Sequence, residues 1–171
     1  MKLALYSGTF DPITKGHKEI IKRASKMCDK LVVAVLNNSA KKTLFSLEER
    51  KEMVEEVLKD IKNIEVVEHS GLLANYMNEI GCKYIIRGLR AVIDYEYELS
   101  LAYGNYDISN GEIETVFIPA SKEYLYVSSS VVRELALYKG KLDNYLDEFV
   151  IEKIKKDLRS KNGKGEEFLC M

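Results

Sequence analysis

The most chemically distinctive segment of the chain is 8–17, which reads GTFDPITKGH and lies between a predicted strand and a predicted helix. Glycine lets backbone N–H groups approach an anion, and a helix N-terminus adds unpaired donors and a positive dipole end. His17 at that position could reach a phosphate. The segment matches neither GxxxxGK[ST] nor GxGxxG. We therefore predict a phosphate site of another design.

Two further segments with unusual chemistry follow predicted strands. Arg87-Gly88-Leu89-Arg90 comes after an apolar run, and a guanidinium at the end of a buried strand normally needs an anionic partner. Residues 121–130, SKEYLYVSSS, open a helix with three serines, whose hydroxyls and free helix N–H groups suit phosphate oxygens. Together the three segments predict one anion-binding crevice.

Each segment also has a purely structural interpretation. A histidine at a helix start is often a cap, paired arginines often form ion pairs at a helix start, and a serine run is often an N-cap with solvated neighbours. The acidic residues Asp94, Glu96 and Glu98 are best interpreted as a solvated helix face. A metal site there is disfavoured because a helix separates side chains two positions apart.

The elements that must position these residues alternate between strand and helix. The pattern predicts strands at Lys2–Tyr6, Leu31–Leu36, Ile64–Val67, Tyr84–Arg87 and Glu114–Ile118. It predicts helices at Lys18–Met27, from the capping box at Ser46 to Asp60, and at Leu72–Ile80, Ala91–Tyr103, Ser128–Tyr138 and Leu142–Leu158. Such alternation indicates an α/β fold: a single-domain, Rossmann-like, doubly wound sheet of five parallel strands flanked by helices. Ligands of such sheets bind at the carboxyl ends of the strands.

Length and composition limit the function classes. The 171 residues, 46% of them hydrophobic, suffice for one domain, which we assign to residues 1–158 with a mobile tail at 159–171. A net charge of −1 argues against a general nucleic-acid binder. The chain has no apolar run long enough for a membrane span, and its three cysteines are scattered. We therefore expect a cytoplasmic protein with no nucleic-acid or membrane partner.

Four sequence blocks together resemble bacterial phosphopantetheine adenylyltransferase, a member of the nucleotidyltransferase superfamily. The blocks are TFDPITKGH, SAKKTLFSLEER, IRGLRAVIDYEYE and SKEYLYVSSSVVRE. The resemblance runs in register from about Lys2 to Lys156, and the IRGLR–DYEYE block is its most specific part. It implies direct transfer of the adenylyl group of ATP to 4′-phosphopantetheine, giving dephospho-coenzyme A and pyrophosphate without a covalent intermediate.

The resemblance also implies roles for individual residues. His17 would stabilise the transition state at the α-phosphate, with Lys41 and Arg90 as further catalytic residues. Phosphopantetheine would be bound by Thr9, Lys41, Leu73 and Arg87. ATP would be bound by Thr9, Phe10, His17, Gly88, Leu89, Arg90, Glu98, Tyr124, Leu125, Tyr126, Val127, Ser128, Ser129 and Ser130. No residue is assigned as a direct metal ligand, and Mg²⁺ is expected to accompany ATP. The resemblance further implies a homohexamer and possible product inhibition by coenzyme A.

These roles agree with the chemistry of the residues. Nucleotidyl transfer needs positioning and charge stabilisation more than covalent catalysis, and the acceptor phosphate is already ionised. Two alternatives stay open. One is an adenylyl- or cytidylyltransferase on the same scaffold that uses another phosphorylated acceptor, such as nicotinamide mononucleotide. The other is a non-catalytic nucleotide-binding regulator. His17 argues against this alternative, because a protein that only binds nucleotide needs no transition-state donor.

Overall fold

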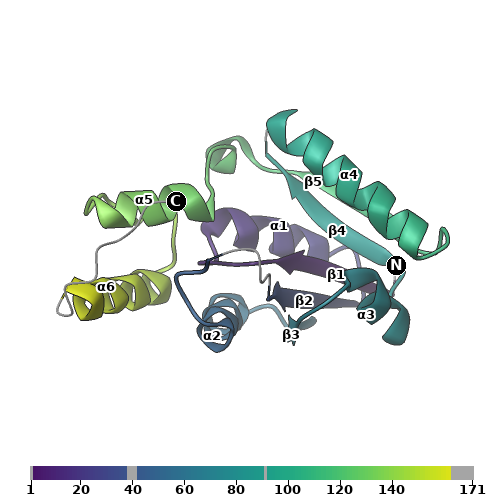
Figure 1. The fold of residues 1–171 in the computed structure, drawn as a ribbon, viewed down its shortest axis with the longest axis horizontal. Coiled ribbons are helices and arrows are strands. Elements are labelled where there is room, and N and C mark those ends of the chain that lie inside the picture. Colours follow the sequence, from purple (N-terminus) through teal and green to yellow (C-terminus); the bar gives the residue numbers. More distant parts are fainter. Residues whose placement is uncertain (1, 38–41, 91, 163–171) are drawn as a thin grey trace.

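A computed structural model describes residues 2–37, 42–90 and 92–162. Its five strands form one sheet in the order β3-β2-β1-β4-β5, and all neighbouring pairs are parallel (Figure 1). The strands are β1 (Leu3–Gly8), β2 (Lys30–Leu36), β3 (Ile64–His69), β4 (Tyr84–Leu89) and β5 (Glu114–Pro119). The helices are α1 (Lys15–Ser25), α2 (Leu47–Leu58), α3 (Leu73–Glu79), α4 (Val92–Ile108), the 3₁₀ turn η1 (Lys122–Tyr124), α5 (Ser129–Leu137) and α6 (Glu148–Asn162). The predicted Rossmann-like parallel fold is confirmed.

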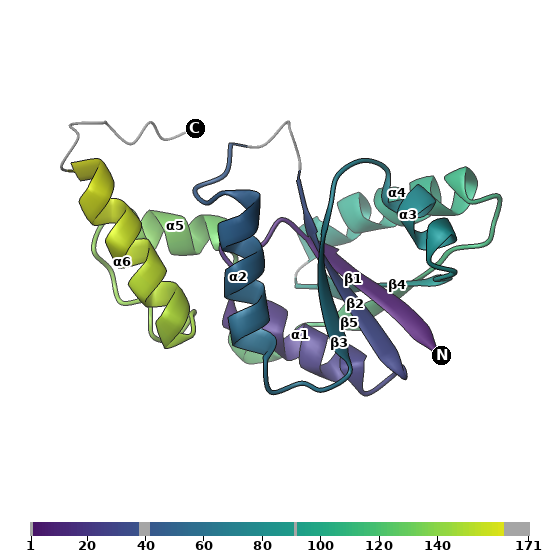
Figure 2. The ribbon, with the colours of Figure 1, turned by 90° about the horizontal axis from the view of Figure 1, so that it is seen from below.

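Apolar side chains on both faces of the sheet explain its two helical layers. Alternate residues of β1 show the division: Tyr6 packs into the core cluster that includes α1 and α2, whereas Leu5 packs into the cluster that includes α3. Figure 2 shows α1 and α2 on one side of the sheet and α3 and α4 on the other. Burial on both faces is why β2 reads as a continuous apolar run.

The strand order reverses beside β1, since the chain winds outward through β2 and β3 and then returns to β4 on the other side. This is the position where doubly wound sheets bind ligands. The segments after β1, β4 and β5 therefore meet at the carboxyl edge. Figure 1 shows α5 and α6 beyond the carboxyl ends of β1 and β2.

Several element boundaries differ from those predicted. Helix α1 begins at Lys15 because Thr14 caps it and His17 occupies the third helical position, where the usual capping box has Glu or Gln. Helix α6 begins at Glu148, since residues 142–147 instead form a turn in which Tyr145 and Leu146 both donate to the carbonyl of Leu142.

At its other end α6 continues to Asn162, past the expected domain boundary at residue 158, and residues 163–171 lie outside the described part. None of the described helices is long and apolar enough to cross a membrane.

Candidate active site

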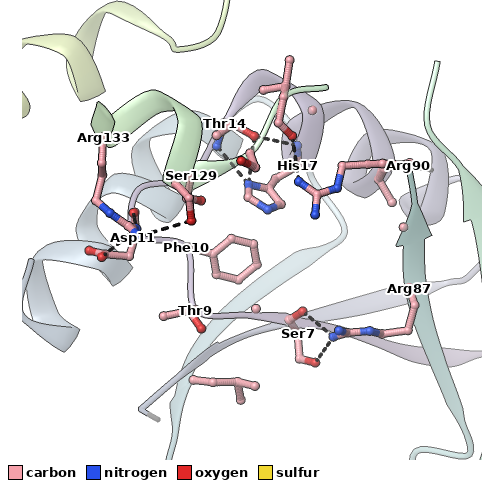
Figure 3. Close-up of a pocket in the computed structure, with 18 of the residues that line it drawn as sticks. Ser7, Thr9, Phe10, Asp11, Thr14, His17, Arg87, Arg90, Ser129 and Arg133 are labelled. Carbon is pink, nitrogen blue, oxygen red and sulfur yellow. Dashed lines mark hydrogen bonds and ion pairs between the residues drawn. The ribbon is translucent and has the colours of Figure 1, made fainter. Parts of the chain in front are cut away.

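A cleft of about 1530 Å³ opens at the carboxyl edge of the sheet and brings the three segments together. Most of the predicted site residues line it: Thr9, Phe10, His17, Leu73, Arg87, Gly88, Arg90, Glu98, Tyr124, Val127, Ser128, Ser129 and Ser130. Leu89, Leu125 and Tyr126 are not among its lining residues, and the Tyr126 side chain is 83% exposed. Lys41 lies outside the described residues. Figure 3 shows how the central side chains of the cleft lie.

His17 is held in one tautomer by the start of α1. Its Nδ1 accepts a hydrogen bond from the backbone N–H of Thr14 at 3.1 Å and lies 3.0 Å from the Thr14 hydroxyl. A backbone N–H can only donate, so Nδ1 carries no proton, and the neutral ring must carry its proton on Nε2. The Thr14 hydroxyl also accepts from the His17 backbone N–H at 3.3 Å. The capping contacts therefore leave His17 with one ring donor, Nε2–H.

The charge state of His17 follows from its surroundings. Burial, with a smaller contribution from the nearby charges of Arg90 and Arg87, lowers its pKa from 6.5 to about 4. The ring is therefore neutral at pH 7. It is a hydrogen-bond donor beside two guanidinium groups, which suits an anionic ligand and excludes a resting imidazolium.

Phe10 fixes the path of the segment 8–17, called here the glycine segment, below His17. Its ring packs edge-on against the His17 ring, with centroids 5.3 Å apart and an interplanar angle of 80°. The backbone of Phe10 has a φ of +49°, which is uncommon for a residue with a side chain. A Cβ on Gly8 would lie 3.0–3.3 Å from this ring, so a side chain at this position would press against Phe10.

Arg87 and Glu98 form one ion pair rather than two separate ligand groups. The Arg87 Nε and NH2 atoms donate to the two carboxylate oxygens at 2.6 and 2.8 Å. NH1 donates to the carbonyl and hydroxyl of Ser7 at 3.0 and 3.1 Å. Burial opposes the charge of Arg87, but the hydrogen bonds and charge of Glu98 outweigh it and raise the pKa of the guanidinium. The anionic partner expected for Arg87 thus lies within the protein, on α4.

Arg90 connects the end of β4 with the segment before α5. Its NH1 donates to the carbonyl of Val127 at 3.1 Å, and Figure 3 shows the guanidinium near the His17 ring. This places a cation, a neutral imidazole donor and the start of α5 around one part of the cleft.

The serines at the start of α5 make different contacts. Ser128 is the N-cap and accepts from the backbone N–H of Val131 at 3.2 Å. The Ser129 hydroxyl donates to the carbonyl of Pro12 at 2.8 Å, which ties α5 to the glycine segment. The first N–H groups of a helix have no intrahelical acceptors, so those of Ser129 and Ser130 add donors to the cleft wall.

Sequence reasoning missed three charged residues that shape the site. The Asp11 carboxylate, 3% exposed, accepts from the backbone N–H groups of Leu44 and Phe45 at 2.8 and 3.0 Å. Arg133 of α5 pairs with Asp11 at 3.1 Å. Arg50 is buried at 1% exposure. The only signal available was the presence of these residues in the motif blocks TFDP, SLEER and SSSVVR, since periodicity assigns a charged residue to the surface.

The geometry suits a ligand with several phosphates. Two arginines, a helix N-terminus and a neutral N–H donor converge on the cleft, and each can act on phosphate oxygens without a covalent step. The arrangement can bind a polyphosphate and stabilise charge that develops on one phosphorus centre.

Comparison with known proteins agrees with this chemistry. A family model described as cytidylyltransferase-like matches residues 5–135. The phosphopantetheine adenylyltransferase of Clostridium botulinum (strain Langeland) is 50% identical over 161 residues, which cover 94% of this chain and 98% of that protein. The protein of the same name from Thermotoga neapolitana is 51% identical over 144 residues, 84% of this chain and 89% of the relative. The one from Fusobacterium nucleatum is 47% identical over 151 residues, 88% of this chain and 93% of the relative.

Two solved structures share the fold. One, described as a nicotinate-nucleotide adenylyltransferase from Vibrio parahaemolyticus, has a TM-score of 0.66 at 16% identity and covers 94% of each chain. A lipopolysaccharide core biosynthesis protein from Thermoplasma volcanium has a TM-score of 0.51 at 22% identity and covers 71% of this chain and 98% of its own. At these identities the likeness establishes the fold alone. The curated relatives establish more: this chain belongs to the phosphopantetheine adenylyltransferase family, within the cytidylyltransferase-like proteins.

Proposed function

We propose that this protein transfers the adenylyl group of ATP to the phosphate of 4′-phosphopantetheine, giving dephospho-coenzyme A and pyrophosphate. The observation that carries the proposal is the convergence of His17, Arg90 and the N-terminus of α5 on one cleft. The choice of acceptor is supported by relatives of that name at about half identity over most of the chain.

The reaction is a single in-line displacement. An oxygen of the acceptor phosphate forms a bond to the α-phosphorus, and the bond from that phosphorus to the α–β bridging oxygen breaks, so that the electron pair leaves with pyrophosphate. The acceptor is already an anion, so no protein group has to remove a proton. Nε2–H of His17 donates to a non-bridging α-phosphate oxygen, where negative charge accumulates in the transition state.

On the nucleotide side, Arg90 and the free N–H groups at the start of α5 would hold the β- and γ-phosphates. Arg90 is tied to the segment before α5 through the carbonyl of Val127, so the two would act as one unit. Tyr124, Val127–Ser130 and Gly88 would form the nucleotide wall, with Phe10 packed below His17.

On the acceptor side, Arg87, Thr9 and Lys41 would face the phosphate of phosphopantetheine. Arg87 is already bidentate with Glu98, so we propose that it acts mainly as a fixed positive charge whose orientation Glu98 maintains. Leu73 and Leu101 line the cleft and offer apolar surface for the pantetheine chain.

Magnesium would enter with the nucleotide. Asp11 and Glu98, carboxylates that line the cleft, are each paired with an arginine, which fits a cation held mainly by phosphate and water oxygens. When bound, it would neutralise part of the triphosphate charge.

We also propose that the protein is a cytoplasmic homohexamer and that coenzyme A inhibits it as a product analogue. Exposed apolar side chains on α4 support a subunit interface there: Tyr95, Tyr97, Leu101, Tyr103, Tyr106 and Ile108. Light scattering on the purified protein tests the assembly, and a monomeric mass at micromolar concentration would contradict it.

Pyrophosphate release from ATP and Mg²⁺ tests the reaction, with 4′-phosphopantetheine, nicotinamide mononucleotide or no acceptor in parallel. We expect release with phosphopantetheine alone. Release only with nicotinamide mononucleotide would assign a different acceptor. Nucleotide binding without release in any arm would favour a regulator.

A further inference from the structure

The largest fully buried side chain in the described part of the protein is a charged one, Arg50 of α2. Burial lowers the pKa of its guanidinium, partly offset by the charges of Asp11, Glu48 and Glu68. Within residues 2–37, 42–90 and 92–162, no carboxylate forms an ion pair with it. A buried arginine held without direct ion pairing is uncommon, so its neutral partners are informative.

Those partners are three backbone carbonyls from separate segments around the cleft. NH1 donates to Thr9 at 2.6 Å and to Leu36 at 2.9 Å, and Nε donates to Phe45 at 3.3 Å. Thr9 follows β1, Leu36 ends β2, and Phe45 precedes the N-cap of α2. One planar group therefore ties together the carboxyl ends of two adjacent strands and the segment that leads into α2.

Asp11 makes the reciprocal connection. Its carboxylate, on the glycine segment, accepts from the backbone N–H groups of Leu44 and Phe45. Peptide groups in the segment 42–45 are thus held from both sides: the N–H groups by Asp11 and a carbonyl by Arg50. Lys42, Thr43 and Leu44 line the cleft, so this double attachment sets where the segment lies relative to residues 8–17.

We propose that Arg50 is a positioning residue for adenylyl transfer, one that aligns the segment 42–45 on the acceptor side with the glycine segment on the nucleotide side. The proposal rests on the proposed function for its kinetic consequence. Arg50 touches no reacting atom. It acts through the backbone of Thr9 and Phe45, where a displacement of about 1 Å can lower a rate by ~10²-fold.

The test uses Arg50→Lys in the full-length protein, because lysine keeps the charge but cannot reach three carbonyls with a planar fork. We expect the KM for phosphopantetheine to rise at least ~10-fold and kcat to fall, while the KM for ATP changes less than ~3-fold. Val57→Ala is the matched control, since Val57 is buried on the same helix and has no part in these contacts. It should lower the melting temperature but leave both KM values near those of the unmodified enzyme.

Amide hydrogen exchange without substrates supplies an independent readout. In Arg50→Lys the N–H groups of Leu44 and Phe45 should exchange at least ~10-fold faster, while those of the central strand β1 stay protected. If Arg50→Lys does not fold, Asp11→Asn provides a second test, because it replaces one of the two acceptor oxygens with an N–H donor and so weakens the attachment from the other side. It should raise the same KM and the exchange at Leu44 and Phe45.

Unchanged KM values in a folded variant, unchanged exchange at both amides, or the same KM increase in Val57→Ala would each overturn the proposal. If the unmodified enzyme releases no pyrophosphate with phosphopantetheine, the proposed function fails. The exchange rates would still decide whether Arg50 holds the two segments together.

Discussion

Replacing His17 with alanine tests the central feature of the site, a single neutral donor facing the cleft. The change removes Nε2–H, and loss of one donor at a developing oxyanion lowers kcat by about 10²–10³-fold, or roughly 2.7–4 kcal/mol. It also removes the acceptor of the Thr14 backbone N–H, which we expect to destabilise the protein by about 1 kcal/mol. The rate effect therefore has to be separated from the capping effect.

Thr14→Ala provides that separation. It removes the cap hydroxyl but leaves the ring and the backbone N–H that fixes its tautomer. We expect a similar loss of stability, about 1 kcal/mol, but a decrease in kcat of less than ~10-fold.

The assay is steady-state pyrophosphate release with both substrates saturating, at a temperature where thermal melts show every variant folded. Because the donor acts in the transition state, kcat and kcat/KM should fall together in His17→Ala. A kcat within ~3-fold of the unmodified enzyme would refute the reasoning. Equal losses in His17→Ala and Thr14→Ala would mean that His17 acts only by starting α1.

Four further outcomes follow from the same geometry. The pKa of His17 is about 4 in the folded protein and 6.5 in the unfolded chain, so the unfolded chain binds more protons between these values. Acidification from pH 7 to pH 4 should then remove about 3 kcal/mol of stability that His17→Asn does not lose, measured by urea unfolding across that range. Replacing Glu98 with alanine should destabilise the protein by about 1–3 kcal/mol, since it leaves the partly buried Arg87 without its carboxylate. Arg87→Ala should raise the KM for phosphopantetheine more than the KM for ATP, and equal increases would contradict the assignment of this arginine to the acceptor. In Gly8→Ala the new methyl group would push on the Phe10 ring that supports His17, so we expect kcat to fall by ~10-fold. Titration calorimetry should show an unchanged affinity for ATP. A loss of ATP affinity would mean that the substitution disturbs nucleotide binding rather than the position of His17.

The amino-acid sequence by itself determined the architecture and the location of the site. Apolar runs alternating with helical periods admit few arrangements other than a parallel sheet with helices on both faces. The carboxyl ends of parallel strands lie at one edge, so segments that follow β1, β4 and β5 had to meet there. The sequence alone therefore assigns one common cleft to His17, Arg90 and the Ser128–Ser130 run.

Only the tertiary structure decided how the charges in that cleft are distributed. The sequence pattern placed Glu98 on a solvated helix face and the resemblance placed it in the ATP site, yet it forms a bidentate ion pair with Arg87. Arg50 and Asp11 received no assignment from the sequence, yet they hold backbone groups 41 and 33–34 positions away in sequence. The protonation of His17 depends on burial and on two arginines at the carboxyl end of β4, Arg87 within the strand and Arg90 just after it. Periodicity records which face of an element a side chain occupies, whereas pairing, tautomer and pKa depend on which atoms lie within about 3 Å after distant segments pack together.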